Sequence, residues 1–193
     1  SLNNDLKIDI VYYNTFTKNE VLPYEDPQFP NQVFYNNAGK TKRKGIEFSG
    51  HYDLNDFFRI NSSISIGEYL FDEFEKNQEN YSGNSIPGIP NNIFIFDVSY
   101  KRSSNLFINI SFKKIGEMYA NNSNSVKIDN YNLVNLKIGQ EIYFKKIMIK
   151  PFLTINNLFG VNYYDNIRIN AFGGRYYEPA PKTTFFGGIK IAF

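Results

Sequence analysis

The chain ends in the segment Thr183–Phe193, with the sequence TTFFGGIKIAF, and this segment decides the fold class. Successive side chains of a β-strand point to opposite faces. One face of the segment is therefore almost entirely apolar and consists of Phe185, Gly187, Ile189, Ile191 and Phe193. An apolar strand at an unpaired sheet edge promotes aggregation, whereas a closed barrel in a membrane leaves no free edge. The segment therefore favours a transmembrane β-barrel.

The composition excludes several other classes of protein. The 21 basic and 19 acidic residues nearly balance, so the net charge gives no reason to expect a nucleic-acid partner. There is no Cys, which excludes disulfides, thiolate metal sites and cysteine nucleophiles, and His51 is the single histidine. The 15 Tyr and 19 Phe are typical of the aromatic girdles of a membrane barrel.

Apolar residues recur at a spacing of two along the whole chain, and the pattern predicts eight strands. No apolar run approaches the roughly 18 residues of a membrane-spanning helix. We expect these eight strands at Leu6–Phe16, Phe34–Tyr52, Phe57–Leu70, Asn92–Tyr100, Leu106–Tyr119, Val134–Ile142, Ile147–Asn156 and Thr183–Phe193.

The connections between these strands alternate between long and short, as in an up-and-down barrel with short periplasmic turns and long outer loops. In the first long loop, 17–32, we expect Pro23, Pro27 and Pro30 to prevent any strand pairing. The predicted fold is an antiparallel transmembrane barrel, of which about eight strands form an arc.

A soluble β-sandwich is the alternative, because its strands also alternate. Its solvated face should be mostly charged, whereas the less apolar face here is rich in Asn, Ser, Gly and Lys. The barrel places the apolar face of each strand against lipid, and the sandwich buries it between two layers. The residues that distinguish the two folds are Ile60, Phe94, Ile110, Leu136 and Ile189.

Four motifs, in order along the chain, resemble the C-terminal part of TonB-dependent outer-membrane receptors. They are Asn37-Ala38-Gly39 followed by Gly45-Ile46-Glu47, Ile86-Pro87-Gly88-Ile89-Pro90, Ile155-Asn156-Asn157-Leu158-Phe159 with Tyr163 or Tyr164, and Pro179-Ala180-Pro181-Lys182 before the last strand. Lys182 stands where the family commonly has Arg, which keeps the positive charge.

The resemblance implies that residues 1–193 are the C-terminal barrel segment of such a receptor, without its plug domain and upstream strands. It implies energy-coupled uptake of a scarce nutrient, such as an iron-siderophore, haem, cobalamin or an oligosaccharide, across the outer membrane of a Gram-negative bacterium. The implied partners are outer-membrane lipid and lipopolysaccharide, the inner-membrane TonB complex acting through the plug, the barrel assembly machinery and a small nutrient ligand. No cofactor, metal or enzymatic activity is expected.

The loop between Gly160 and Lys182 is the best candidate for a ligand site, because Arg and Tyr recur at binding hot spots. Its candidate residues are Tyr163, Tyr164, Arg168, Arg175, Tyr176 and Tyr177. The resemblance also implies that Ile189, Ile191 and Phe193 form the signal read by the assembly machinery. The basic run 40–44 either binds anions such as lipopolysaccharide phosphates or is simply solvated. For His51 we expect a structural role.

Two other functions stay open at this point. An autonomous eight-stranded barrel, acting as an adhesin or a structural protein, requires Leu6–Phe16 to pair with Thr183–Phe193. A barrel enzyme such as an outer-membrane lipase requires a Ser or Asp near His51 at the membrane interface, and we expect His51 on the periplasmic side. The first residues, 1–5, carry no signal peptide, and we expect them to continue from a longer chain.

Overall fold

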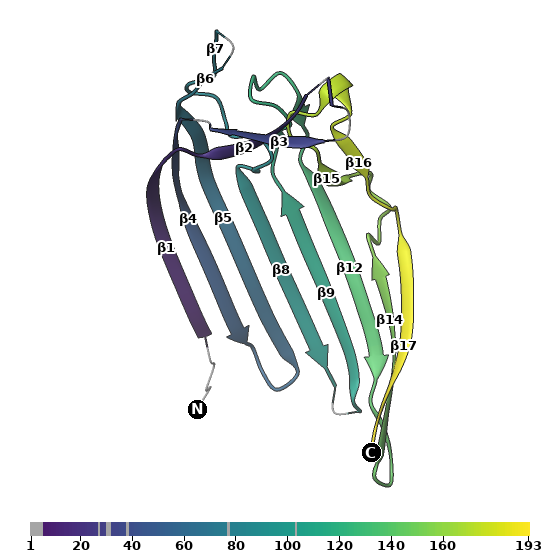
Figure 1. Cartoon of the computed structure of the whole chain (residues 1–193). Helices are drawn as coiled ribbons and strands as arrows, with labels where there is room; N and C mark the ends of the chain where they lie inside the picture. The colour runs from purple at the N-terminus through teal and green to yellow at the C-terminus, as the bar shows by residue number, and fades with distance from the viewer. Residues whose placement is uncertain (1–5, 27, 30–31, 38, 77, 103) are drawn as a thin grey trace.

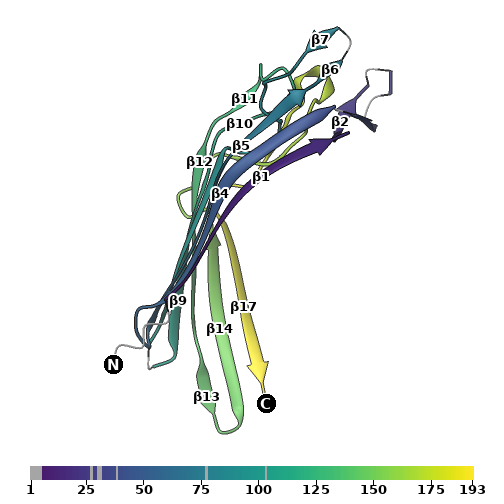
Figure 2. The same ribbon diagram turned by 90° about the vertical axis from the view of Figure 1, so that its left-hand side faces the viewer.

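One curved antiparallel sheet makes up most of the molecule, and Figures 1 and 2 show it from its face and from its edge. The computed structural model describes residues 6–26, 28–29, 32–37, 39–76, 78–102 and 104–193. Among the described residues the sheet has nine strands. Because β13 continues the line of β12 beyond Glu141, the sheet is eight strands wide. Their bounds are β1 (Leu6–Lys18), β4 (Lys40–Asp53), β5 (Phe58–Glu73), β8 (Asn92–Lys101), β9 (Leu106–Ile115), β12 (Tyr131–Gln140) with β13 (Ile142–Phe144), β14 (Ile147–Asn156) and β17 (Thr184–Ala192).

Neighbouring strands of the sheet follow one another in the sequence, which confirms the predicted up-and-down order. Three short turns lie at one end, after Asp53, Lys101 and Phe144, and the long connections lie at the other end. Each long connection contains a short hairpin. These hairpins are β2 (Val21–Glu25) with β3 (Val33–Asn37), β6 (Glu75–Lys76) with β7 (Glu79–Asn80), β10 (Met118–Tyr119) with β11 (Lys127–Ile128), and β15 (Tyr164–Ile167) with β16 (Tyr177–Pro179).

The strand registers bring the predicted apolar faces together on one side of the sheet, which we call the apolar face. One row of directly paired residues crosses all eight long strands, and every side chain in it is aliphatic or aromatic. It runs Leu6, Tyr52, Ile60, Val98, Ile110, Leu136, Ile155 and Phe185. Ile110 is 45% exposed and Ile189 is 67% exposed, and Ile60, Phe94 and Leu136 are partly exposed. Within the described residues no second layer covers these side chains, so the alternative of a soluble β-sandwich is wrong and the prediction of an antiparallel barrel arc is confirmed.

The opposite side, which we call the polar face, carries a matching row of hydrophilic side chains. This row runs Lys7, His51, Asn61, Asp97, Ser111 and Asn135. Alternation of an apolar and a polar face over tilted antiparallel strands is the pattern of a membrane barrel, with lipid outside and a polar interior.

The long edges of the sheet, β1 and β17, are not joined to each other in the described part of the chain. β1 pairs with β4 and β17 pairs with β14, and the sheet remains open between them. The pairing of Leu6–Phe16 with Thr183–Phe193 that an autonomous eight-stranded barrel requires is therefore not formed here.

Several predicted boundaries are corrected by the structure. The first long loop does contain a ladder, in which Pro23 pairs with Tyr35, because a two-stranded hairpin tolerates a missing donor at its edge. Pro27 and Pro30 lie outside the described residues. The predicted strand Phe34–Tyr52 is two strands, since Gly39 turns the chain with a φ of +68°, and a Cβ there would clash with the Glu73 carbonyl oxygen.

The fifth and sixth predicted strands also divide. β9 ends at Ile115, and Met118–Tyr119 belongs to the separate hairpin β10–β11. Glu141 interrupts the sixth strand between β12 and β13. Alternating hydrophobicity continues through both breaks, so periodicity alone does not reveal them.

The only helical segment among the described residues is the short 3-10 turn η1 (Phe172–Gly174). Within that part of the chain, none of the helical structure has the length and apolarity that crossing a membrane would need.

Candidate functional site

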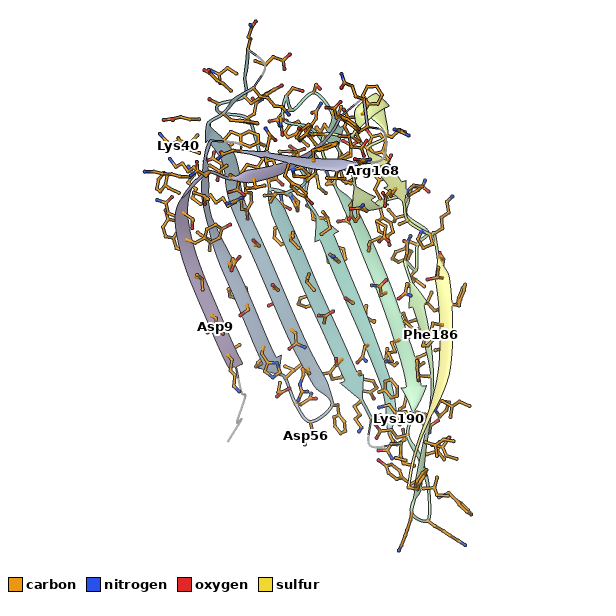
Figure 3. The ribbon with its side chains drawn as sticks, in the orientation of Figure 1. Asp9, Lys40, Asp56, Arg168, Phe186 and Lys190 are labelled. Atoms are coloured by element: carbon orange, nitrogen blue, oxygen red, sulfur yellow. The ribbon has the colours of Figure 1, made fainter. Side chains whose placement is uncertain are left out.

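The four long connections meet at one end of the sheet, and we call the described residues within 19–39, 74–91, 116–130 and 157–183 the loop cluster. Figure 3 shows side chains crowded there around Arg168, while Asp56 and Lys190 mark the turn end. Glu25 of the first loop forms an ion pair with Arg168 of the last loop, and only 4% of the Glu25 side chain is exposed. The Phe172 amide also donates to Glu25, at 3.2 Å. The first and last loops are thus fastened together across the sheet.

Asparagine side chains connect the remaining loops. Asn170 donates from Nδ2 to the Pro23 carbonyl at 3.1 Å and to Asn122 Oδ1 at 3.0 Å. Asn84 donates from Nδ2 to the Asn122 carbonyl at 2.8 Å. Asn124 accepts from the Ser85 amide at 2.7 Å. Because an amide both donates and accepts, a few such side chains satisfy the irregular backbone of several loops at once.

A small hydrophobic core lies beneath the loops and shows which way they bend. It contains Leu22, Phe71, Phe74 and Ile86, with Tyr69 packed against it. Tyr69 belongs to the polar face, and its hydroxyl lies 2.6 Å from the hydroxyl of Tyr13 on the same face. The loop cluster therefore lies over the polar face, which is the interior side of a barrel.

A cavity of about 420 Å³ lies elsewhere, on the apolar face, and the loop cluster holds a second cavity of about 270 Å³, which we call the outer pocket. The outer pocket is lined by Tyr24, Glu25, Lys76, Tyr81, Asn121, Asn122, Ser123, Asn170 and Tyr176. All four long connections contribute residues to this lining. Three of them, the first, the second and the last, supply its aromatic rings.

The electrostatics of the outer pocket centre on Lys76. Its Nζ lies 3.7 Å from the ring centroid of Tyr24, and burial lowers the pKa of Lys76 below its ordinary value. A hydrogen bond to Glu79, together with burial, raises the pKa of Tyr81 to about 12, so its hydroxyl stays protonated. A cation, three tyrosines and several amides suit an anionic or conjugated ligand that accepts hydrogen bonds.

The structure brings only part of the predicted ligand set to this pocket. Tyr176 lines it, and Tyr177 beside it stacks on Tyr164 with ring centroids 4.5 Å apart. Arg168 reaches the pocket wall through its ion pair with Glu25. Tyr176 is thus the one member of the predicted set in the pocket lining itself, and two members, Tyr163 and Arg175, contact residues elsewhere.

Those two residues have different partners. Tyr163 packs against Tyr131 at the start of β12, with ring centroids 5.1 Å apart. Arg175 donates from Nε to the Phe172 carbonyl at 3.4 Å. The aromatic and basic lining that the sequence did not single out is Tyr24, Lys76 and Tyr81, and these residues stand in loops whose folding onto one another has no local sequence signal.

The basic run 40–44 divides between the two faces of β4. On the polar face Arg43 pairs with Glu20 at 2.9 Å, and its hydrogen bond lowers the pKa of Glu20. On the apolar face Lys40 pairs with Glu73 and Lys44 with Glu68, both at 2.6 Å. Lys42 lies over the Phe16 ring, 5.5 Å from its centroid. The run is therefore no single anion site.

His51 and the last strand lie far from the loop cluster. His51 contacts Asn61 Oδ1 at 2.7 Å and Asp53 Oδ2 at 3.3 Å, at the turn end of β4. The described residues contain no cluster of His, Asp and Glu suited to a metal ion. Ile189, Ile191 and Phe193 project from the apolar face of β17 and its end, and Phe193 is fully exposed.

Comparison with known proteins agrees with this architecture. The model of the family described as TonB dependent receptor-like, beta-barrel, matches residues 2–162. The siderophore receptor PiuA of Acinetobacter baumannii has a TM-score of 0.73 and 17% identity, over 97% of this chain and 26% of its own. The ferric yersiniabactin uptake receptor FyuA of Yersinia pestis has a TM-score of 0.74 and 18% identity, over 98% of this chain and 28% of its own.

The copper transporter OprC is similar as well, with a TM-score of 0.71 and 15% identity, over 95% of this chain and 27% of its own. At such identities the likeness shows the fold alone. The chain spans little more than a quarter of the length of these structures. The extent of the family match, taken with the open sheet of alternating faces, shows that this chain belongs to the TonB-dependent receptor family, within its β-barrel.

Proposed function

We propose that this chain is the C-terminal part of the barrel of an outer-membrane receptor in a Gram-negative bacterium. The receptor takes up a scarce nutrient with energy from the inner-membrane TonB complex, acting through a plug domain encoded upstream. Family membership supports this proposal, and so does the gathering of all four long connections over the polar face.

The substrate class we propose is a ferric siderophore, with haem, cobalamin and an oligosaccharide as the alternatives. The observation that carries this choice is the outer pocket, where Lys76 lies against Tyr24 and near Tyr176. A ferric chelate with anionic or aromatic arms presents the charge and the ring faces that such a lining binds. The siderophore receptors among the structural neighbours support the same class.

Titration calorimetry on the intact purified receptor tests this proposal, with ferric siderophores, haem, cobalamin and an oligosaccharide as probes. We expect a ferric siderophore to bind, and Lys76→Gln or Tyr176→Ala to weaken it roughly five- to thirtyfold, as expected for one lost cation–π or stacking contact. Lys146→Gln, in the exposed turn at the opposite end, is the matched control.

Three results would contradict the proposal. Binding of an oligosaccharide with no binding of any ferric siderophore would show that the substrate class is wrong. Equal losses of ferric siderophore affinity in Lys76→Gln and Lys146→Gln would show that the outer pocket does not hold the ligand. Iron uptake by cells that persists after the proton-motive force is removed would contradict the energy coupling.

A further inference from the structure

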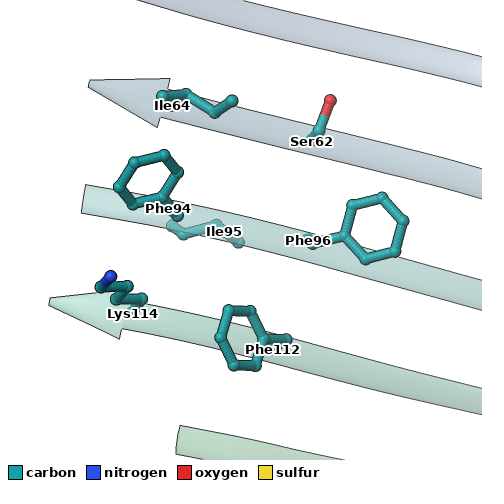
Figure 4. A pocket seen from close by; sticks show the side chains of 7 residues that line it. All are labelled: Ser62, Ile64, Phe94, Ile95, Phe96, Phe112 and Lys114. Carbon is teal, nitrogen blue, oxygen red and sulfur yellow. The ribbon is translucent and has the colours of Figure 1, made fainter. Parts of the chain in front are cut away.

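The apolar face carries a hollow of about 420 Å³, which we call the lipid-side hollow. Its walls are the side chains of Ile64 on β5, Phe94 and Phe96 on β8, and Phe112 on β9 (Figure 4). It exists because Ser62 pairs with Phe96 on one side and with Gly50 on the other, so two small residues adjoin the large rings. A groove walled by Ile and Phe suits a hydrocarbon chain.

One end of the lipid-side hollow is basic. Lys114, near the end of β9 where the long connection begins, lines it together with Phe94, and Lys114 Nζ lies 5.7 Å from the Phe94 centroid. Figure 4 shows Lys114 at the same end as Phe94 and Ile64, with Phe96 at the other. None of the ion pairs found among the described residues includes Lys114. Its charge is therefore left for a group outside the protein.

The same arrangement recurs on the same face. Lys42, also toward the loop end of its strand, lies over Phe16 and takes part in none of the described ion pairs. Lysines near a membrane surface extend their charged ends toward the interface and attract anionic lipid headgroups. The hollow and its lysine thus match the two parts of a lipid, with the headgroup at the loop end and the chain below it.

We propose that the lipid-side hollow binds lipopolysaccharide, with one acyl chain against Phe94, Phe96 and Phe112 and a lipid A phosphate at Lys114. This proposal rests on the outer-membrane location proposed above, where the loop end of the strands meets the outer leaflet. The hollow lies on the face opposite to the outer pocket, so the lipid and the nutrient occupy separate sites.

Native mass spectrometry of the intact receptor, extracted in detergent and titrated with diphosphoryl lipid A, tests this proposal. We expect Lys114→Gln to lower the bound fraction about fivefold, the effect of one lysine on an anionic lipid. Ser62→Leu fills the hollow and should lower binding to a similar extent. Lys113→Gln and Ser63→Leu are the matched controls, since each changes the neighbouring residue on the polar face.

Equal lipid A binding by Lys114→Gln and Lys113→Gln would overturn the proposal, and so would equal binding by Ser62→Leu and Ser63→Leu. Displacement of lipid A by an equal amount of phosphatidylglycerol would show a general anionic-lipid contact and would overturn the assignment to lipopolysaccharide. Ferric siderophore binding measured on the same samples shows that each variant is folded. A receptor that binds the siderophore but fails the lipid tests refutes only the lipid site.

Discussion

At the scale of single residues, glycines opposite aromatic rings set how the polar face packs. The Tyr13 hydroxyl would lie 2.5 Å from a Cβ at Gly45 and 2.6 Å from one at Gly67, so the ring rests on two glycines of the neighbouring strands. The Phe152 ring lies against Gly188 in the same way, with 2.7 Å to a Cβ built there. Large rings on the inner side of a curved sheet need such space beside them.

Gly45→Ala should destabilise the barrel by about 1–3 kcal/mol, as overpacking does in well-packed sites. The added Cβ would also lie 2.5 Å from the Ile66 carbonyl oxygen, and a paired backbone cannot move away easily. Gly187→Ala is the control, because its Cβ meets only the Phe152 carbonyl oxygen at 3.7 Å. Urea unfolding of the intact receptor in lipid measures both variants, and similar midpoints for the two would contradict this account of the packing.

Glu141 is the second residue whose role is local and testable. Its carboxylate accepts from Lys101 and from Lys150, both at 2.9 Å, and these bonds lower the pKa of Glu141 to about 2. A carboxylate with a lowered folded-state pKa stabilises the protein above its ordinary pKa of 4.5 and loses that contribution as the pH falls toward 2.

We therefore expect Glu141→Gln to be less stable than the wild type at pH 7, with the difference shrinking between pH 4.5 and about 2. The measurement is the urea midpoint of both proteins across that pH range. A difference that stays constant down to pH 2 would mean that the charge of Glu141 contributes nothing.

At the scale of elements, the long strands were predictable from the sequence and the loop hairpins were not. β14 and β17 fall almost at their predicted bounds because their alternation is set by a two-sided environment, apolar on one side and polar on the other. The hairpins β2–β3 and β15–β16 depend on contacts between distant loops, such as Glu25 with Arg168. No local pattern encodes those contacts.

The candidate site shows the same division. Tyr176 of the pocket lining and Arg168, the partner of Glu25, were predictable as site residues because Tyr and Arg occur together in one loop. Tyr24 and Lys76 come from two other loops and meet only in the folded chain, so the sequence does not reveal them. The assembly role of Ile189, Ile191 and Phe193 stays a prediction, and their exposure makes it testable.

Phe193→Ala should lower the amount of receptor assembled in the outer membrane several-fold without changing the stability of the assembled fraction. Phe193 is fully exposed, so removing its ring should change the stability of the folded protein little. Heat-modifiable mobility on gels measures assembly, and urea unfolding of the assembled fraction measures stability. Unchanged assembly, or a lower midpoint in the assembled fraction, would contradict a recognition role.

At the scale of the whole molecule, two faces with different surroundings account for the fold and for both proposed sites. The apolar face carries the lipid-side hollow, and the polar face lies under the loop cluster and its outer pocket. The open edges at β1 and β17 are compatible with further strands that complete a barrel.

Spin labels on the intact receptor in lipid vesicles test the assignment of the two faces most directly. This chain has no Cys of its own that would take the label, and single cysteines are introduced at Ile64 and Ile110 on the apolar face and at Ser63 and Ser111 on the polar face of a receptor without other Cys. We expect the first two labels to relax with oxygen dissolved in the lipid and the last two to relax with a water-soluble nickel complex. Labels at Ile64 and Ile110 that are shielded from oxygen, or that relax with nickel as strongly as those at Ser63 and Ser111, would contradict the barrel orientation on which the account rests.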